Sequence, residues 1–541
     1  MTIERFPRLG HQEEDNNPAI QMFGRRFYAD QTSIEYLAEL LLLFISRKRV
    51  GDGNWNWERS FPDIDVLKSW HDNETLKYAP PARLSLKLFA FLATSRLETR
   101  HACHRDHFEI IAEELLNRIE TSSSLTKDQV LTLLEQVLTG FTGIAKSRTW
   151  CTHTFLPICP ELIARETIWK HKDAFKKPKL TWHGAIDSGL FVVSNHDFMA
   201  RGGEVLFLQL CNLFQKLDSQ EAALFEQEIG YSAGSRLQLR SRIENGINKL
   251  FETTSSIDKL AEWISSADRQ TQQELDKDVF KPMTCGWCPS ESWKEGYLFA
   301  CEIANLCDAG IDPLEKVKML KLGCVLQVLR SICAQSARKW TGLSEESSNL
   351  GGANGFAWIV TDPQSGDSVL KDAASRNLVR IQEMVHGAIR HPDIQLFGDY
   401  GNDPRKYKDA DAQAHLLLVK LAKSMDFIIP YKGPNPRFAM TDQVLRFLVL
   451  ALVPPGQRMT LNSFQNQLYL HYGIAMSGPL LNRAVQWTFP DQRFTLHSVE
   501  QSWVEDKLRA TGFLIPLSDA VSLVQNPFGQ GRDLRTRKVE R

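Results

Sequence analysis

The chain has 541 residues, of which 43% are hydrophobic and 24% are charged, and its net charge at pH 7 is −1. This length exceeds a single typical core, and the composition is that of an ordinary globular protein, so we expect two to four domains. The near-zero net charge excludes a basic field over the whole surface, and any contact with nucleic acid must therefore be local.

No segment of the sequence predicts a membrane or secreted protein. The longest apolar run near the N-terminus, at 40–45, is too short to cross a bilayer, and the first ten residues lack the apolar core of a signal peptide. The ten cysteines are spread along the chain and do not form a dense disulfide framework. We therefore expect a cytoplasmic protein with reduced thiols and no membrane partner.

Apolar residues recur at helical spacing through most of the chain and predict a mainly helical body. After a polar lead-in over 1–26, Thr32 and Glu35 have the spacing of a capping box and begin the first helix. Residues 147–185 are expected to be irregular, and 344–367 form a linker that holds one short strand. The further helices are predicted at 83–96, 101–119, 126–146, 202–217, 219–228, 234–251, 256–277, 291–308, 313–340, 371–390 and 410–427.

The last hundred residues have the element order of a winged helix. One helix begins after Thr441 and ends at Pro454, a second ends before Gly473, and a third begins near Ser477. Two apolar segments within 512–524 then predict a hairpin, the wing. Three helices followed by a hairpin are a variant of the helix-turn-helix, in which one helix enters the major groove of DNA.

The predicted fold class is therefore mainly α, with a multi-domain helical body and a C-terminal winged-helix (α+β) unit. The expected parts are an N-terminal helical domain at 1–150, a central helical domain at 151–343, a linker and helical connector at 344–425, a winged-helix-like domain at 426–528 and a basic tail at 529–541.

Three groups of basic residues are candidates for contact with nucleic acid. The third C-terminal helix presents Arg483 beside Asn482 and Gln486, and one cation neutralises little phosphate charge, so DNA contact and protein docking stay equal alternatives. Lysines alternate with aromatic residues around 165–182, as in single-strand contacts, although an exposed loop has the same composition. The tail is either a phosphate contact or a solvated chain end. The candidate residues are Lys170, Lys172, Lys176, Lys177, Lys179, Arg483, Arg535, Arg537 and Lys538.

Two motifs have a spacing that suits metal ligands. Cys285 and Cys288 form a CxxC pair, as in zinc knuckles and redox sites, but the sequence supplies neither two further ligands nor a thioredoxin-like context. His101 and His104 share a helix face, but no HExxH motif completes a site. We favour a structural role for both motifs and expect no cofactor. The chain also lacks Walker A and GxSxG motifs, which favours a non-catalytic protein over an enzyme.

Three segments resemble accessory components of the Druantia antiphage defence system of bacteria: RFYADQT at 26–32, MARGGE at 199–204 and LSDAVSLVQNPF at 517–528. The resemblance implies a role in antiviral defence beside other defence-operon proteins, with a helicase-like subunit among them, and it carries over no catalytic residue. We therefore expect a non-catalytic subunit that binds DNA, partner proteins or both. The alternatives are a metal-dependent, nuclease-like enzyme and a winged-helix transcriptional regulator.

Overall fold

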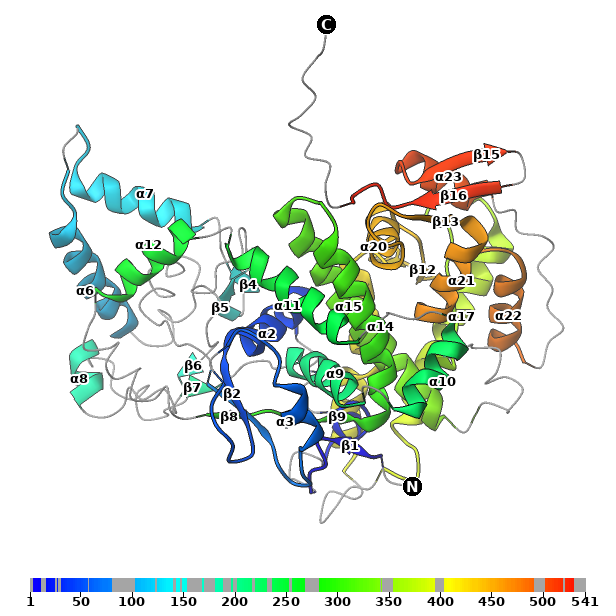
Figure 1. Cartoon of the computed structure of the whole chain (residues 1–541), viewed down its shortest axis with the longest axis horizontal. Helices are drawn as coiled ribbons and strands as arrows, with labels where there is room; N and C mark the ends of the chain where they lie inside the picture. The colour runs from blue at the N-terminus through cyan, green and yellow to red at the C-terminus, as the bar shows by residue number, and fades with distance from the viewer. Residues whose placement is uncertain are drawn as a thin grey trace, which may run out of the picture. The chain divides into compact units, whose positions relative to one another are not determined.

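A computed structural model of the chain is mainly helical, with several small sheets of two or three strands (Figure 1). The predicted helical class is thus confirmed. The structure describes residues 3–10, 16–24, 27, 31–56, 58–79, 103–121, 124–139, 143–145, 148–152, 168–169, 181–187, 196–197, 202–216, 219–230, 236–252, 255–267, 282–340, 342, 354–394, 403–490, 502–518 and 521–529.

The chain divides into two units, each made of separate stretches of sequence. The first unit consists of Met1–Ser33, Leu208–Gly246 and Trp287–Arg541, and the second unit consists of Ile34–Phe207 and Ile247–Gly286. Within the described ranges, no helix has both the length and the apolar character needed to cross a membrane.

The second unit is built around helix α2 (Ser33–Ile45) and an antiparallel sheet in the order β2-β3-β8. Its strands are β2 (Arg47–Val50), β3 (Leu76–Ala79) and β8 (Met283–Thr284). This sheet is not among the elements predicted from the sequence. The other elements are α3 (Ile64–Lys68), α6 (Cys103–Arg118), α7 (Lys127–Thr139), β4 (Gly143–Ala145), β5 (Arg148–Thr152), β6 (Ile168–Trp169), α8 (Trp182–Asp187), β7 (His196–Asp197) and α12 (Ser255–Ser265).

Helix α9 (Gly203–Gln215) begins against α2 at a point where only glycine fits. A Cβ atom on Gly203 would lie 2.6 Å from the carbonyl oxygen of Tyr36 and 2.7 Å from the amide nitrogen of Leu40. The Gly203 amide also donates to Glu39 Oε2 over 2.6 Å. The missing side chain therefore lets the start of α9 approach the α2 backbone.

Replacing Gly203 by alanine is expected to lower the free energy of unfolding by about 1 to 3 kcal/mol, because backbone atoms of α2 must move. Urea denaturation followed by tryptophan fluorescence measures the change. Gly366→Ala is the matched control, since nothing lies within 4 Å of the Cβ position of Gly366. Equal stabilities of the two variants would contradict the close approach of α9 to α2.

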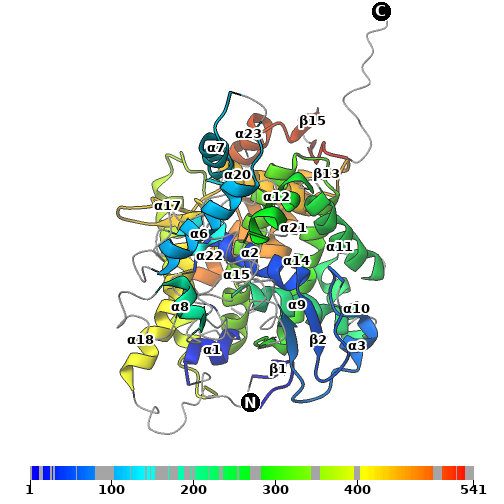
Figure 2. The same cartoon turned by 90° about the vertical axis from the view of Figure 1, so that its left-hand side faces the viewer.

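The core of the first unit is formed by two long helices, α14 (Trp293–Asp308) and α15 (Pro313–Lys339), which lie against each other (Figure 1 and Figure 2). Asp312 caps α15 by accepting from the amide of Leu314 over 2.8 Å, and a proline follows at the first helical position. The helices α17 (Ser368–Ala388), α19 (His415–Ser424) and α20 (Asp442–Leu452) pack on this pair. The remaining elements are β1 (Arg5–Phe6), α1 (Pro18–Phe23), α10 (Gln220–Ile229), α11 (Arg236–Glu252, which continues into the second unit), β9 (Cys288–Pro289), the short 3-10 helix η5 (Ser290–Ser292), α18 (Pro404–Gln413), β11 (Ile428–Ile429) and β12 (Arg437–Phe438).

The short strand expected within 344–367 is present as β10 (Trp358–Ile359), but it is not part of an exposed linker. It pairs in parallel with β14 (Ile474–Ala475), and its residues are fully buried. Asn377 holds the strand by accepting from the Ile359 amide and donating to the Ala357 carbonyl, each over 3.0 Å. The linker prediction is therefore wrong for this stretch, because its apolar residues fill the core.

The C-terminal elements follow one another as α20, β13 (Arg458–Thr460), α21 (Leu461–Tyr472), β14, α22 (Gly478–Thr488), α23 (Ser502–Ala510), β15 (Leu514–Ser518) and β16 (Val521–Gln525). The last two strands form the predicted hairpin, and β13 pairs with β16, which gives an antiparallel sheet in the order β13-β16-β15. Helix α23 was not predicted. It lies between the third helix and the hairpin.

Three further predictions are corrected. The polar lead-in contains β1 and α1, and Met22 and Phe23 of α1 are buried. The helix predicted at 410–427 is two helices, because the backbone of Ala414 (φ −117°, ψ −106°) leaves the helical region between α18 and α19. The helix predicted at 126–146 ends at Thr139, before the strand β4.

Candidate nucleic-acid interface

A long segment of the C-terminal region contains no carboxylate. Between Asp442 and Asp491 the chain has no aspartate or glutamate, although acidic residues make up 65 of the 541 positions. This acid-free segment, 443–490, covers nearly all of α20 and the whole of β13, α21, β14 and α22. With its three arginines and no carboxylate, the segment itself has a net charge of +3, whereas the whole chain has −1, and this sign of charge favours an anionic partner.

Helix α22 presents a polar face to solvent. Its apolar residues Leu481, Ala484, Val485 and Trp487 are buried, whereas Asn482, Arg483 and Gln486 are exposed, as the helical spacing predicts. In the first unit α22 packs on α17, β10 and β14, and the hydroxyl of Thr488 accepts from Asn377 over 2.9 Å. These contacts fix the buried side of α22, and its polar side therefore faces solvent.

The elements before α22 add further exposed polar groups. Thr460 caps α21 by accepting from the amide of Ser463 over 3.1 Å, so β13 leads directly into the helix. The exposed polar residues of β13 and α21 are Arg458, Thr460, Asn462, Ser463 and Asn466. Hydroxyl, amide and guanidinium groups of this kind hydrogen-bond to phosphates and base edges.

Only some of the nearby cations are available to a partner. Arg446 is paired with Glu315 and lies against the rings of Phe513 and Phe528. Among the described residues, no carboxylate pairs with Arg458 or with Arg483. Those two arginines are the candidate phosphate contacts of the acid-free segment.

Arg483 also lies close to α21. Burial raises the pKa of Tyr469 to about 12, and the positive charge of Arg483 offsets part of that rise. The guanidinium of α22 is therefore near the last turns of α21, so both helices contribute to the same part of the surface.

A buried ion pair anchors the C-terminal end of α21 to the core. Arg330 of α15 and Glu302 of α14 have side-chain exposures of 0% and 1%, and they pair in a bidentate manner over 2.7 and 3.1 Å. Arg330 Nη1 also donates to the carbonyl oxygen of His471 over 3.1 Å, and His471 Nδ1 lies 3.0 Å from Glu302 Oε1. Three helices are thus joined through one buried charge pair.

The pKa values of Glu302 and Arg330 depend on the contact between the two side chains. Burial by itself raises the pKa of Glu302, but the Arg330 guanidinium and the hydrogen bond to His471 outweigh it and hold that pKa below its usual value. Burial likewise lowers the pKa of Arg330, and Glu302 reverses the shift. Each charge is stable in the core only because the other is present.

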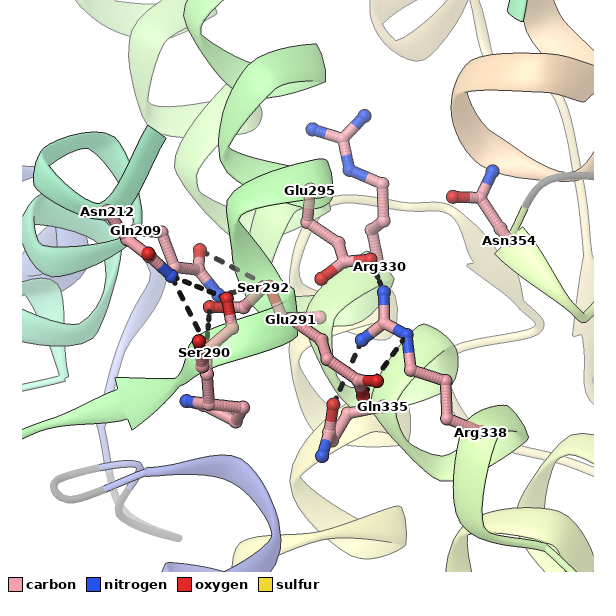
Figure 3. Close-up of polar contacts among 12 residues, drawn as sticks. Gln209, Asn212, Ser290, Glu291, Ser292, Glu295, Arg330, Gln335, Arg338 and Asn354 are labelled. Atoms are coloured by element: carbon pink, nitrogen blue, oxygen red, sulfur yellow. Dashed lines mark hydrogen bonds and ion pairs between the residues drawn. The ribbon is translucent and has the colours of Figure 1, made fainter. Parts of the chain in front are cut away.

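Figure 3 shows Arg330 together with other polar residues of this region, among them Gln209, Glu295, Gln335 and Arg338. Gln327 donates to Gln209 over 2.7 Å, and Gln209 donates to Ser331 over 2.9 Å. Arg338 pairs with Glu295 and donates to Gln335 over 2.9 Å. The interface of α14 and α15 is therefore held by a network of polar groups as well as by apolar packing.

A further side chain of the core also holds the C-terminal end of α21. Asn354 donates to the carbonyl oxygen of Leu470 over 2.7 Å, one residue before the carbonyl that Arg330 holds. Two core side chains therefore satisfy consecutive carbonyls in the last turn of α21, where helices leave such groups without intrahelical partners.

Most of the basic candidates predicted from the sequence lie outside the described residues. Arg483 is exposed on α22, whereas Lys170, Lys172, Lys176, Lys177, Lys179, Arg535, Arg537 and Lys538 lie outside the described residues. Their part in binding stays a prediction.

The metal candidates are not brought together into a site. Cys285 and Cys288 are fully buried, and burial raises the pKa of the Cys288 thiol to about 12. His101 lies outside the described residues, and His104 lies in α6 at a position where the side chain is not described. Within the part of the chain that is described, no three His, Cys, Asp or Glu residues are grouped so that they could hold a metal ion.

Two further features of this region have signals in the sequence but are not among the sequence predictions. The absence of acidic residues over 443–490 can be seen without a structure, and it adds Arg458, Asn462 and Asn466 to the candidates. Glu302 and Arg330 each interrupt an otherwise apolar stretch of helix, which is the mark of a buried charge. Their pairing could not be seen, because 28 residues separate them.

No protein-family model, curated protein or solved structure matches the chain. Any function assigned to the chain therefore depends on its own residues.

Proposed function

We propose that residues 442–525 form a winged-helix unit that docks the protein on double-stranded DNA, and that the protein is a non-catalytic subunit. Winged helices follow the order helix, strand, helix, helix and hairpin, and their first strand joins the sheet beside the hairpin. The order α20, β13, α21, α22, β15 and β16, with the sheet order β13-β16-β15, supports this assignment. Helix α23 is then an insertion before the wing.

The acid-free segment is the observation that carries the proposal of DNA over a protein partner. Its exposed polar side chains are amides, hydroxyls and the guanidinium groups of Arg458 and Arg483, with which no described carboxylate pairs. Such groups suit phosphates and base edges. The centres of protein interfaces are instead rich in aromatic and other large apolar side chains. None of the exposed large hydrophobic residues found in the described chain lies within 443–490.

Replacing Arg458 and Arg483 together by alanine is expected to weaken duplex binding at low salt by on the order of tenfold or more, because each arginine releases counterions when it meets a phosphate. The logarithm of the binding constant falls with the logarithm of the salt concentration by about 0.9 for each phosphate contact. The double variant should therefore reduce that slope by about 2. Fluorescence anisotropy with a labelled duplex over a salt series measures both quantities.

The control removes the same charge from another surface, by replacing the exposed Lys408 and Lys432 with alanine. A third variant with Arg535, Arg537 and Lys538 neutralised separates the contribution of the tail. An unchanged slope in the Arg458 and Arg483 variant, beside normal folding, would contradict the proposed interface.

A separate proposal concerns the cellular role of the protein. We propose a cytoplasmic place in a multi-gene bacterial antiviral defence assembly, and its support is the resemblance of the segments at 26–32, 199–204 and 517–528 to Druantia accessory components. A tagged chain expressed with its neighbouring genes should retain the operon-encoded proteins after nuclease treatment. Recovery of nucleic acid alone would argue against an assembly and for a stand-alone regulator.

A further inference from the structure

The exposed polar side chains of α22 are few, and two of the three are amides. Asn482, Arg483 and Gln486 are its only exposed residues with polar side chains. Asn482 and Gln486 are four residues apart, so they lie on the same side of the helix within one turn of each other. The two amides therefore lie next to each other on the exposed face of α22, the face with which a recognition helix contacts bases.

We propose that α22 recognises adenine in the major groove through the side-chain amides of Asn482 and Gln486, so that DNA docking is sequence-selective. This inference rests on the proposed function, because it assigns a base preference to the same interface. It concerns base readout, whereas Arg458 and Arg483 account for phosphate contact.

The chemistry of the amide group selects adenine among the four bases. In the major groove adenine presents the N7 acceptor beside the N6 donor, and an amide offers a donor and an acceptor side by side. Guanine presents two acceptors in the same place, so the amide oxygen would face O6 without a hydrogen. One amide therefore forms two hydrogen bonds with adenine and only one with guanine.

The structure holds α22 in a form suited to such readout. Trp487 is fully buried behind the helix, and Thr488 and Asn377 tie its last turn to α17. Because the helix backbone is held, the two amides keep a constant spacing and direction of approach to the bases, which favours selectivity. A helix fits the major groove of B-form DNA, whereas the deep, narrow major groove of double-stranded RNA excludes it.

The test uses the full chain and three duplexes of equal length. One contains adenines in mixed sequence, the second carries 7-deazaadenine at those positions, and the third contains only G·C pairs. The N7 acceptor is absent from the second duplex, while base pairing and the minor-groove edge are kept. We expect the wild type to bind the first duplex on the order of tenfold more tightly than either of the others.

The double variant Asn482→Ala with Gln486→Ala should bind all three duplexes alike, at the level at which the wild type binds the G·C duplex. Gln220→Ala with Gln227→Ala is the matched control, because it removes two exposed amides from α10, outside the proposed interface, and should keep the preference.

Equal binding of the wild type to all three duplexes would overturn the adenine inference and leave the proposed DNA docking intact. A preference that survives in the Asn482 and Gln486 variant would also overturn it. Failure of the wild type to bind any duplex, or tighter binding to RNA of the same sequence, would overturn the proposed function as well.

Discussion

Replacing Arg330 by methionine is expected to lower the free energy of unfolding by about 3 to 5 kcal/mol, because it leaves the buried Glu302 charge without its partner. The same change removes the contact with the His471 carbonyl, so the end of α21 loses one of its anchors. Urea denaturation measures the stability. The double variant Arg330→Met with Glu302→Leu should recover a large part of the loss, since neither charge is then buried alone.

The pH dependence of the stability of Arg330→Met is a second test of the ion pair. The pKa of Glu302 is lowered in the folded protein, so its contribution to stability is fully present above the unfolded pKa of about 4.3 and is lost as the pH falls through the folded pKa. Without Arg330, burial should raise the pKa of Glu302, and acid then relieves the variant by protonating the carboxylate. The stability gap between wild type and Arg330→Met should therefore narrow on acidification. A gap that stays constant from pH 7 to pH 4 would show that Glu302 does not need Arg330.

Replacing Trp358 by alanine is expected to cost about 3 to 5 kcal/mol of unfolding free energy, as large cavities in a core do. The ring is fully buried in β10 and lies 5.1 to 5.5 Å, between ring centres, from Phe356, Phe427 and Phe438. Thermal and urea denaturation check the effect. Val379→Ala on the exposed side of α17 is the control and should change the stability little.

Because β10 pairs with β14, just before α22, the Trp358 variant should also weaken duplex binding where it remains folded. A smaller loss in Trp358→Phe, which keeps an aromatic ring in place, would fit this packing. Equal and slight losses in Trp358→Ala and Trp358→Phe would contradict a central role for the ring.

Elements with local signals could be predicted from the sequence. Helix α15 starts where Asp312 and Pro313 provide a cap and a first helical residue, and its apolar spacing continues to the end. The hairpin was placed correctly because turn-forming residues separate two apolar segments, β15 and β16. In each case the deciding interactions lie within a few residues of one another.

Elements that depend on distant partners could not be predicted. Strand β3 pairs with β8 across some two hundred residues, and nothing local marks either strand as a member of that sheet. The break between α18 and α19 lacks the glycine or proline that usually ends a helix, so the spacing at 410–427 indicated one helix.

In the candidate interface, too, local features could be predicted from the sequence and distant pairings could not. Helix α22 and its three exposed polar residues were predicted from the sequence. The acid-free segment can also be recognised in the sequence. Only the structure shows that the carboxylate of Glu315 pairs with Arg446, while among the described residues no carboxylate pairs with Arg458 or Arg483. Which cations remain available depends on packing between segments far apart in the chain.

Hydrogen exchange of the full chain with and without a duplex tests the DNA-docking proposal most directly. The proposal predicts that added DNA slows exchange in β13, α21, α22 and the β15–β16 hairpin, and that Arg458→Ala with Arg483→Ala weakens this protection at the same DNA concentration. Protection confined to other parts of the chain, or an exchange pattern that the duplex leaves unchanged at low salt, would contradict it.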